Sequence, residues 1–326
     1  MFDTELKKKI RQGMIVAGLA LGCYLFLVLI AEEAVVIDAM LSLPWQAWLL
    51  VALLSFVNYA TRMIRWHFFL RELDTRLTWH VDALAYFSGF ALTATPAKVG
   101  EALRCVLLAN HEVPYSRSMA TCLIERMLDL VIIVLLAAPL LILGSDYAWF
   151  MAVGLLLVVV VAFAVVKTDT RAVLRFLPKF LSHRLDSSVD AIDRLLVQAR
   201  GLLTARVIFY GSVLGGIGWA AEGVGLYLIL DYLGAEQPLV WTVAVYATAS
   251  LVGAITFMPG GLGTSEAALI VLLTASGMDF SVATAATLIC RALTLWLAIA
   301  LGIVCLLAYQ LFGISPSNLK LESQLK

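Results

Sequence analysis

Residues 96–101 read Pro-Ala-Lys-Val-Gly-Glu, and residues 259–266 read Pro-Gly-Gly-Leu-Gly-Thr-Ser-Glu. Each stretch lies within apolar sequence, and each combines a proline, a glycine four residues later and a glutamate shortly after. Proline and glycine interrupt helices, and at membrane depth the freed backbone is tolerated only where it lines a cavity or is buried in protein. Both stretches therefore predict the tip of a broken helical hairpin.

The composition around these tips is that of a membrane protein. Of the 326 residues, 62% are hydrophobic and 14% are charged, and the mean hydropathy is +0.95. Ordinary soluble domains contain about 45–50% apolar and about 25% charged residues. Apolar runs of about twenty residues recur along the chain, which is the length that a membrane-spanning helix needs. We therefore predict an all-α polytopic membrane protein and exclude a nucleic-acid-binding or disulfide-scaffold protein.

The apolar runs divide the chain, which we treat as a single membrane domain over 1–326. The expected parts are an N-terminal transmembrane helix (14–31), a first repeat (45–143) with its hairpin (82–109), a connecting transmembrane helix (148–166), a cytoplasmic amphipathic segment (167–206), a second repeat (207–312) with its hairpin (239–277), and a cytoplasmic tail (313–326). The amphipathic segment either lies flat on the anionic inner leaflet or packs under the bundle as an elbow helix.

Orientation follows from the basic residues, because cytoplasmic loops carry an excess of lysine and arginine. If the N-terminus is cytoplasmic and each hairpin returns to its own side, the cytoplasmic pieces hold seventeen of the 23 Lys and Arg residues. The loops on the opposite side hold none and contain seven carboxylates instead. We therefore expect a multi-pass protein of the cytoplasmic (inner) membrane with both termini in the cytoplasm.

The two tips belong to a longer pattern that occurs twice. Arg126 follows Pro96 by thirty residues, and Arg291 follows Pro259 by thirty-two. Because one extra span separates the two copies, the second copy is expected to be inverted relative to the first. Inverted repeats with discontinuous helices at their interface are typical of secondary transporters, whose substrate site lies near the bilayer midplane.

The candidate site consists of charged residues within the apolar segments, where an isolated charge costs several kcal/mol and is expected to face the bundle interior. Substrate binding is assigned to Lys98, Arg104, Arg126 and Arg291, because arginine gives bidentate geometry for phosphate and lysine adds charge. Charge pairing or proton coupling is assigned to Glu101, Glu125, Asp129, Glu222 and Glu266. The hairpin tips contain Pro96, Gly100, Pro259, Gly260, Gly261 and Gly263. In an alternative interpretation, these ions only pair and fix helix register.

Local geometry refines these expectations. Thr95 before the first tip, and Thr264 or Ser265 after the second, are expected to be helix N-caps. Both hairpin tips would then present helix N-termini toward the centre of the bundle and form an anion site. Glu125 and Asp129 share a helix face, whereas Arg126 points about 100° away and is expected to reach a different partner. Arg62 and Arg65, near a cytoplasmic helix end, are interpreted as snorkelling to lipid headgroups.

No catalytic constellation, metal-ligand spacing or nucleotide-binding loop is visible, so we expect no enzyme activity, no metal and no cofactor. The cysteines have no CxxC or CxxH spacing and are interpreted as small buried apolar residues. They are Cys23, Cys105, Cys122, Cys290 and Cys305.

The motifs, taken in order, resemble the lysylphosphatidylglycerol synthase transmembrane-domain family, also called flippase-like, over about 45–312. They are Pro96-x-Lys98-x-Gly100-Glu101-x-x-Arg104, Glu125-Arg126-x-x-Asp129 and Pro259-Gly260-Gly261-Leu262-Gly263-x-x-Glu266. The resemblance implies lipid translocation in a prokaryotic membrane. Lys98 stands where the family pattern has arginine, which keeps the charge but weakens bidentate phosphate recognition. The sequence to Lys326 leaves no room for the soluble aminoacyltransferase domain of the multidomain relatives, so synthase activity is not expected.

These observations favour translocation, by a flippase or scramblase-like route, of an anionic phospholipid or a polyprenyl-phosphate-linked headgroup. The expected partners are that lipid and a lipid-modifying enzyme, not nucleic acid. Two alternatives stay open, a secondary transporter of a small soluble anion and a non-transporting membrane subunit of a lipid-modifying complex.

Overall fold

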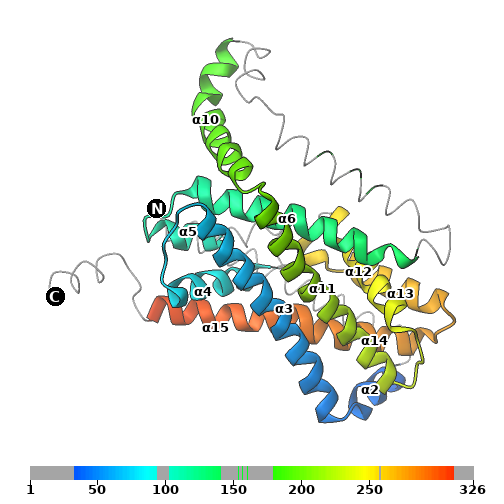
Figure 1. Ribbon diagram of the computed structural model, residues 1–326. Helices are drawn as coiled ribbons and strands as arrows, with labels where there is room; N and C mark the ends of the chain where they lie inside the picture. Colours follow the sequence, from blue (N-terminus) through cyan, green and yellow to red (C-terminus); the bar gives the residue numbers. More distant parts are fainter. Residues whose placement is uncertain are drawn as a thin grey trace.

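The structure is a computed structural model that describes residues 33–93, 103–140, 179–256 and 258–311, together with 153, 156 and 160 (Figure 1). The predicted N-terminal helix (14–31), most of the connecting helix (148–166) and the tail (313–326) lie outside the described residues. The first predicted tip also lies outside them, with Thr95, Pro96, Lys98, Gly100 and Glu101.

Within the described residues all regular structure is helical. The helices are α2 (Glu33–Ser42), α3 (Trp45–Glu72), α4 (Trp79–Ser88), η1 (Gly89–Leu92), α5 (Leu103–Ala109), α6 (Tyr115–Ala137), α10 (Lys179–Gly201), α11 (Ala205–Tyr232), α12 (Leu239–Ile255), η4 (Pro259–Gly261), α13 (Thr264–Ala275), α14 (Phe280–Arg291), η5 (Ala292–Trp296) and α15 (Leu297–Leu311). Three are long and apolar enough to cross a membrane: α3, α11 and the continuous helix Phe280–Leu311. The prediction of an all-α polytopic membrane protein is confirmed, and the division into two repeats stays a prediction.

α11 packs directly on α3 because glycines line their contact. A Cβ atom at Gly211 would lie 2.7 Å from Phe69 and from Leu128, and one at Gly218 would lie 2.8 Å from the Thr61 hydroxyl. A Cβ at Gly215 would collide with the Arg65 guanidinium. Small residues allow membrane helices to approach closely, so this glycine seam sets the distance between α3 and α11.

The second predicted tip coincides with a break between α12 and α13, two helices that pack against each other. Gly260, Gly261 and Gly263 have φ values of 60°, 69° and 81°, which residues with a side chain rarely adopt. The N-cap of α13 is Gly263, and no side chain caps it. The prediction that Thr264 or Ser265 caps this helix is therefore wrong. The Thr264 hydroxyl instead bonds the Gly261 carbonyl oxygen at 3.3 Å, which ties it to the tip.

The helix after Arg291 contains a π-helical turn, η5, and continues as α15. α15 packs along α4 and η1. It approaches η1 so closely that a Cβ at Gly302 would lie 2.6 Å from the Phe90 carbonyl carbon. These contacts hold η1 beside the centre of the molecule, where Phe90 and Thr93 line the cavity described below.

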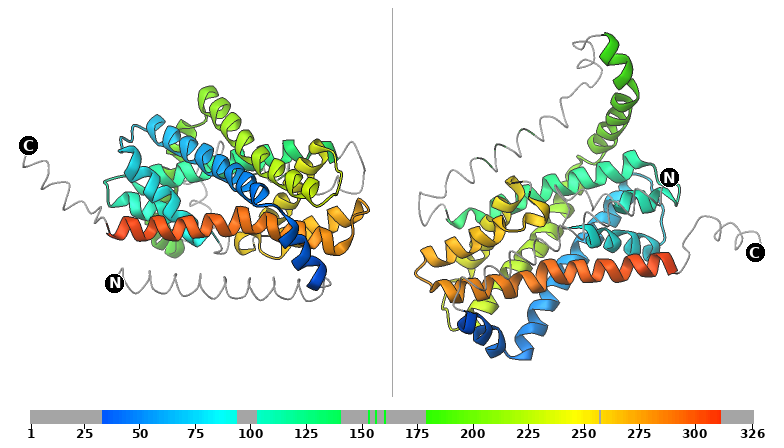
Figure 2. Two further views of the ribbon diagram at one scale, coloured as in Figure 1. Left: turned by 90° about the horizontal axis from the view of Figure 1, so that it is seen from below. Right: turned by 180° about the vertical axis from the view of Figure 1, so that it is seen from behind.

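The amphipathic segment includes α10, which packs against α6 through its C-terminal half and projects away from the other helices at its N-terminal end (Figures 1 and 2). Leu196, Ala199 and Leu202 are buried, whereas Ile192 and Val197 are exposed. The C-terminal half of α10 therefore fits the elbow-helix interpretation.

Candidate functional site

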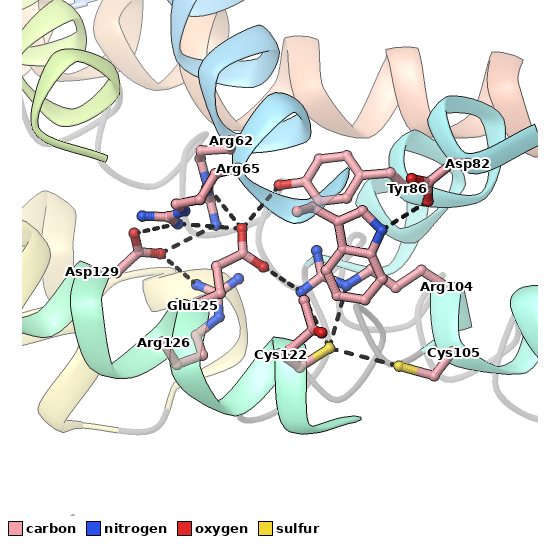
Figure 3. A network of polar contacts seen from close by, with 12 residues as sticks. Arg62, Arg65, Asp82, Tyr86, Arg104, Cys105, Cys122, Glu125, Arg126 and Asp129 are labelled. Carbon is pink, nitrogen blue, oxygen red and sulfur yellow. Dashed lines mark hydrogen bonds and ion pairs between the residues drawn. The ribbon is translucent and has the colours of Figure 1, made fainter. Parts of the chain in front are cut away.

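A network of buried ions joins α3 to α6 (Figure 3). Arg65 is fully buried, and its Nη2 atom lies 3.2 Å from Glu125 Oε1 and 2.6 Å from Asp129 Oδ1. Glu125 is also fully buried, and its spacing of four from Asp129 places both carboxylates on the face of α6 that meets α3. The expected shared face of Glu125 and Asp129 is thus present, and one arginine bridges the two carboxylates.

Arg104 completes the network on the α5 side. Its Nη2 atom lies 2.6 Å from Glu125 Oε2, and its guanidinium stacks 4.0 Å from the Trp66 ring and 4.9 Å from the Tyr86 ring. The Tyr86 hydroxyl donates a 3.2 Å hydrogen bond to Glu125 Oε1. Arg104 is only 1% exposed. The structure therefore places Arg104 behind the site, in an aromatic stack.

Asp129 is shared by further cations on its other side. Arg62 Nη2 lies 3.5 Å and Arg126 Nη1 3.6 Å from Asp129 Oδ2, while Trp219 Nε1 donates to Oδ1 at 3.2 Å. Arg126 thus reaches Asp129, three positions onward on its own helix, and its expected pairing with a further partner stays a prediction.

The interpretation of Arg62 and Arg65 as snorkelling residues is also wrong. Arg62 is 8% exposed and Arg65 is 0% exposed, and both pair with carboxylates of α6. Distance from a helix end does not reveal what lies beside the helix. The signal that could have found them is complementary spacing: two arginines three apart on one helix match two carboxylates four apart on another.

Beside this network lies a cavity of about 330 Å³. Its lining comes from helices of both predicted repeats and from η1. It is lined by Tyr59, Arg62, Phe90, Thr93, Arg126, Asp129, Leu130, Ile133, Trp219, Glu222, Tyr246, Ser250, Gly253, Ala254, Met258, Gly260, Gly261, Ser265, Arg291, Thr294, Leu295 and Ala298. Six of the sequence-derived candidates meet here: Arg126, Asp129, Glu222, Gly260, Gly261 and Arg291. Arg104, Glu125, Gly263 and Glu266 do not line it.

The far wall of the cavity is built by the second tip and its neighbours. Arg291 Nε lies 2.7 Å from Glu266 Oε1, and Arg291 Nη2 donates to the Gly260 carbonyl oxygen at 3.0 Å. Glu266 is therefore adjacent to the site through Arg291. The Tyr246 hydroxyl donates to Glu222 Oε2 at 2.6 Å. This wall thus presents one guanidinium, held against the tip, and one carboxylate, held by a phenol.

Tyr59, Trp219 and Tyr246 line the cavity although the sequence did not single them out. Aromatic residues in membrane helices are usually interpreted as packing residues or interfacial anchors. Only their hydrogen bonds in the structure indicate that these three belong to the site. The Tyr59 hydroxyl donates a 2.5 Å hydrogen bond to the Thr294 carbonyl oxygen in η5. In the parts of the chain that the structure describes, no three His, Cys, Asp or Glu side chains are grouped to hold a metal ion. The arrangement suits a polar, anion-bearing group in an otherwise apolar surrounding.

Comparison with known proteins assigns the chain to a family. The model of the lysylphosphatidylglycerol synthase TM region matches residues 15–302, and the chain belongs to that family. A UPF0104 membrane protein of Methanothermobacter thermautotrophicus is 27% identical over 295 residues, which cover 83% of this chain and 86% of that protein. A UPF0104 membrane protein of Pyrococcus horikoshii is 24% identical, over 82% of this chain and 89% of that protein. The phosphatidylglycerol lysyltransferase of Staphylococcus xylosus is 31% identical over 98 residues, only 10% of its length.

Proposed function

We propose that this membrane protein translocates an anionic lipid across the cytoplasmic membrane, holding the headgroup in the central cavity while the acyl or prenyl chains stay in the bilayer. The candidate lipids are an anionic phospholipid and a polyprenyl-phosphate-linked lipid. The observation that carries the proposal is the composition of the cavity wall, which places Arg62, Arg126 and Arg291 around about 330 Å³ among membrane helices.

Charge compensation supports this proposal. A phosphate that crosses hydrocarbon without partners is costly, and a guanidinium can offset that cost through two parallel hydrogen bonds. Arg126 is the most accessible of the three arginines, with a side-chain exposure of 32% against 10% for Arg62 and 14% for Arg291. Asp129 has Arg65 at 2.6 Å, so it stays compensated when a headgroup phosphate takes over Arg126.

The second tip provides a link between the headgroup and the gate. Arg291 contacts both Glu266 and the Gly260 carbonyl oxygen. A phosphate that draws Arg291 into the cavity competes with both contacts and loosens the tip. Glu266 neutralises Arg291 while the cavity is empty. The first tip, with Lys98 and Glu101, is proposed to act in the same way on its own side.

The proposal includes three narrower statements. The chain moves lipid and carries no aminoacyltransferase activity. It resides in the inner membrane with both termini in the cytoplasm, as the distribution of basic residues supports. A lipid-modifying enzyme supplies or uses the lipid, in keeping with the name of the Staphylococcus xylosus relative, phosphatidylglycerol lysyltransferase.

The test is leaflet exchange in proteoliposomes that contain purified protein and headgroup-labelled anionic or zwitterionic lipids. Wild type is compared with Arg126→Ala and Glu266→Gln, with and without a proton gradient. Arg206→Ala is the matched control, because Arg206 is 66% exposed and pairs with Glu72 at 3.0 Å far from the cavity. We expect exchange by wild type and the control, and at least a tenfold loss in Arg126→Ala, which changes the cavity lining, and in Glu266→Gln, which changes the partner of Arg291.

Two results would redirect the proposal. If folded wild type exchanges no lipid above empty vesicles but takes up a small soluble anion in an Arg126-dependent manner, the protein is a soluble-anion transporter. If it moves neither lipid nor anion, and the variants change only its association with a lipid-modifying enzyme, it is a membrane subunit of that complex.

A further inference from the structure

Two cysteines that are seventeen positions apart in the sequence meet behind the site. Cys105 lies on α5 and Cys122 on α6, and their sulfur atoms are 3.6 Å apart (Figure 3). Both are free thiols. Cys105 is 1% exposed, whereas Cys122 is partly exposed. The pair therefore consists of one partly exposed cysteine and one enclosed cysteine, with their sulfur atoms within reach of each other.

Cys122, the partly exposed cysteine, has a cationic neighbour. Arg104 donates to Cys122 Sγ through Nε at 3.4 Å and through Nη2 at 3.3 Å. A guanidinium beside sulfur stabilises the negative charge of a thiolate, and the thiolate is the form that attacks a disulfide. Cys122, the more exposed of the two residues, thus has the cationic neighbour that an attacking thiol needs, and Cys105 has the position of a resolving thiol.

We propose that Cys105 and Cys122 form a thiol–disulfide site that joins α5 to α6 when the protein meets a small-molecule disulfide. The Cys122 thiolate attacks one sulfur of that disulfide, forms a mixed disulfide and releases one thiolate. The Cys105 thiol loses its proton and attacks the Cys122 sulfur, which breaks the mixed disulfide and releases the second thiolate. The two cysteines are oxidised to one disulfide, and the small disulfide is reduced to two thiols.

The geometry needs only a short movement. A disulfide bond is about 2.05 Å long, so the sulfur atoms, now 3.6 Å apart, must approach by about 1.5 Å. Helices α5 and α6 already contact each other. The new bond links α5 to α6, and it changes the sulfur atom to which Arg104 donates. α5 begins two residues after the first predicted tip. Arg104 is paired with Glu125 at 2.6 Å, so the bond reaches the ion network in one step.

The covalent test uses the full-length protein in membranes or detergent. The protein is treated with an aromatic disulfide such as dithiodipyridine, the remaining thiols are alkylated, and the peptides are identified by mass spectrometry. We expect a Cys105–Cys122 linkage within one chain, a loss of two hydrogen atoms in intact mass, and reversal by a thiol reductant. Cys105→Ser is expected to trap the mixed disulfide on Cys122, whereas Cys122→Ser leaves Cys105 unreacted.

Cys290→Ser is the matched control, because Cys290 is buried in α14 and is expected to leave the linkage unchanged. Folded wild type that gives only mixed disulfides, no reaction, or links to other cysteines overturns the proposal without any variant. The effect on lipid exchange is a separate readout that rests on the proposed function. Oxidised wild type is expected to exchange lipid at least threefold more slowly, and reductant is expected to restore the rate. If the disulfide forms and exchange is unchanged, the site exists but does not regulate transport.

Discussion

Glu125→Gln tests whether the buried network holds α3, α5 and α6 together. Glu125 is 0% exposed; Oε1 accepts from Arg65 and Tyr86, and Oε2 accepts from Arg104. An amide keeps the size but removes the charge, and in either orientation its NH2 group faces a donor. Breaking a buried ion pair from one side costs about 3–5 kcal/mol, because the partner charge stays buried. We expect that loss in the free energy of unfolding, measured by SDS titration in mixed micelles.

The matched control is Glu72→Gln, which removes a carboxylate of the same type from an exposed pair. Glu72 lies 3.0 Å from Arg206, whose side chain is 66% exposed. Exposed ion pairs contribute about 0–1 kcal/mol, so this variant is expected to unfold nearly as wild type does. Equal effects of the two substitutions, or a change below about 1 kcal/mol for Glu125→Gln, would refute the reasoning that the network is structural.

Three further predictions use the same measurement. In Gly215→Ala the new methyl group collides with the Arg65 side chain of α3, so the variant is expected to lose about 1–3 kcal/mol of unfolding free energy. Gly216→Ala has open space at its Cβ atom and is expected to unfold as wild type does. Gly302→Ala meets the backbone of η1 rather than a side chain, so it should cost at least as much as Gly215→Ala; a smaller cost would contradict the close approach of α15. Tyr246→Phe removes the 2.6 Å hydrogen bond to Glu222 and is expected to cost about 1.5–3 kcal/mol; an unchanged unfolding curve would show that this bond adds no stability.

The sequence predicted those features that depend on order along the chain. The Pro-Gly punctuation at 259–263 predicted a helix break there, and the apolar runs predicted the helical class. Arg126, Asp129, Glu222 and Arg291 were singled out because a charge in an apolar segment is costly wherever it lies. The structure adds that these four surround one cavity, which the sequence could only suggest through the repeat.

The predictions from sequence were wrong where the contacts of a side chain depend on the helix packed beside it. Arg62 and Arg65 sit near a helix end, so depth alone suggested contact with lipid headgroups, yet α6 supplies carboxylates beside them. Arg104 looked like a ligand for phosphate, but Trp66 and Glu125 enclose it. The sequence prediction placed a threonine or serine at the N-cap of α13, because their side-chain oxygens accept hydrogen bonds from the first N–H groups of a helix. In the structure the N-cap is Gly263, which has a positive φ and makes no side-chain hydrogen bond.

The π-helical turn η5 fixes the relative orientation of two contacts that lie on either side of it along one helix. Upstream, Arg291 faces the cavity; downstream, Gly302 faces η1. One residue advances an α-helix by about 100° around its axis, so the wider turn at Ala292–Trp296 sets the rotational phase between them. Deleting a single residue from this turn would leave hydropathy and length almost unchanged while rotating one contact away from its neighbour. The helix is therefore tolerant of substitution on its outer face but intolerant of insertions and deletions, a constraint on rotational phase rather than on composition.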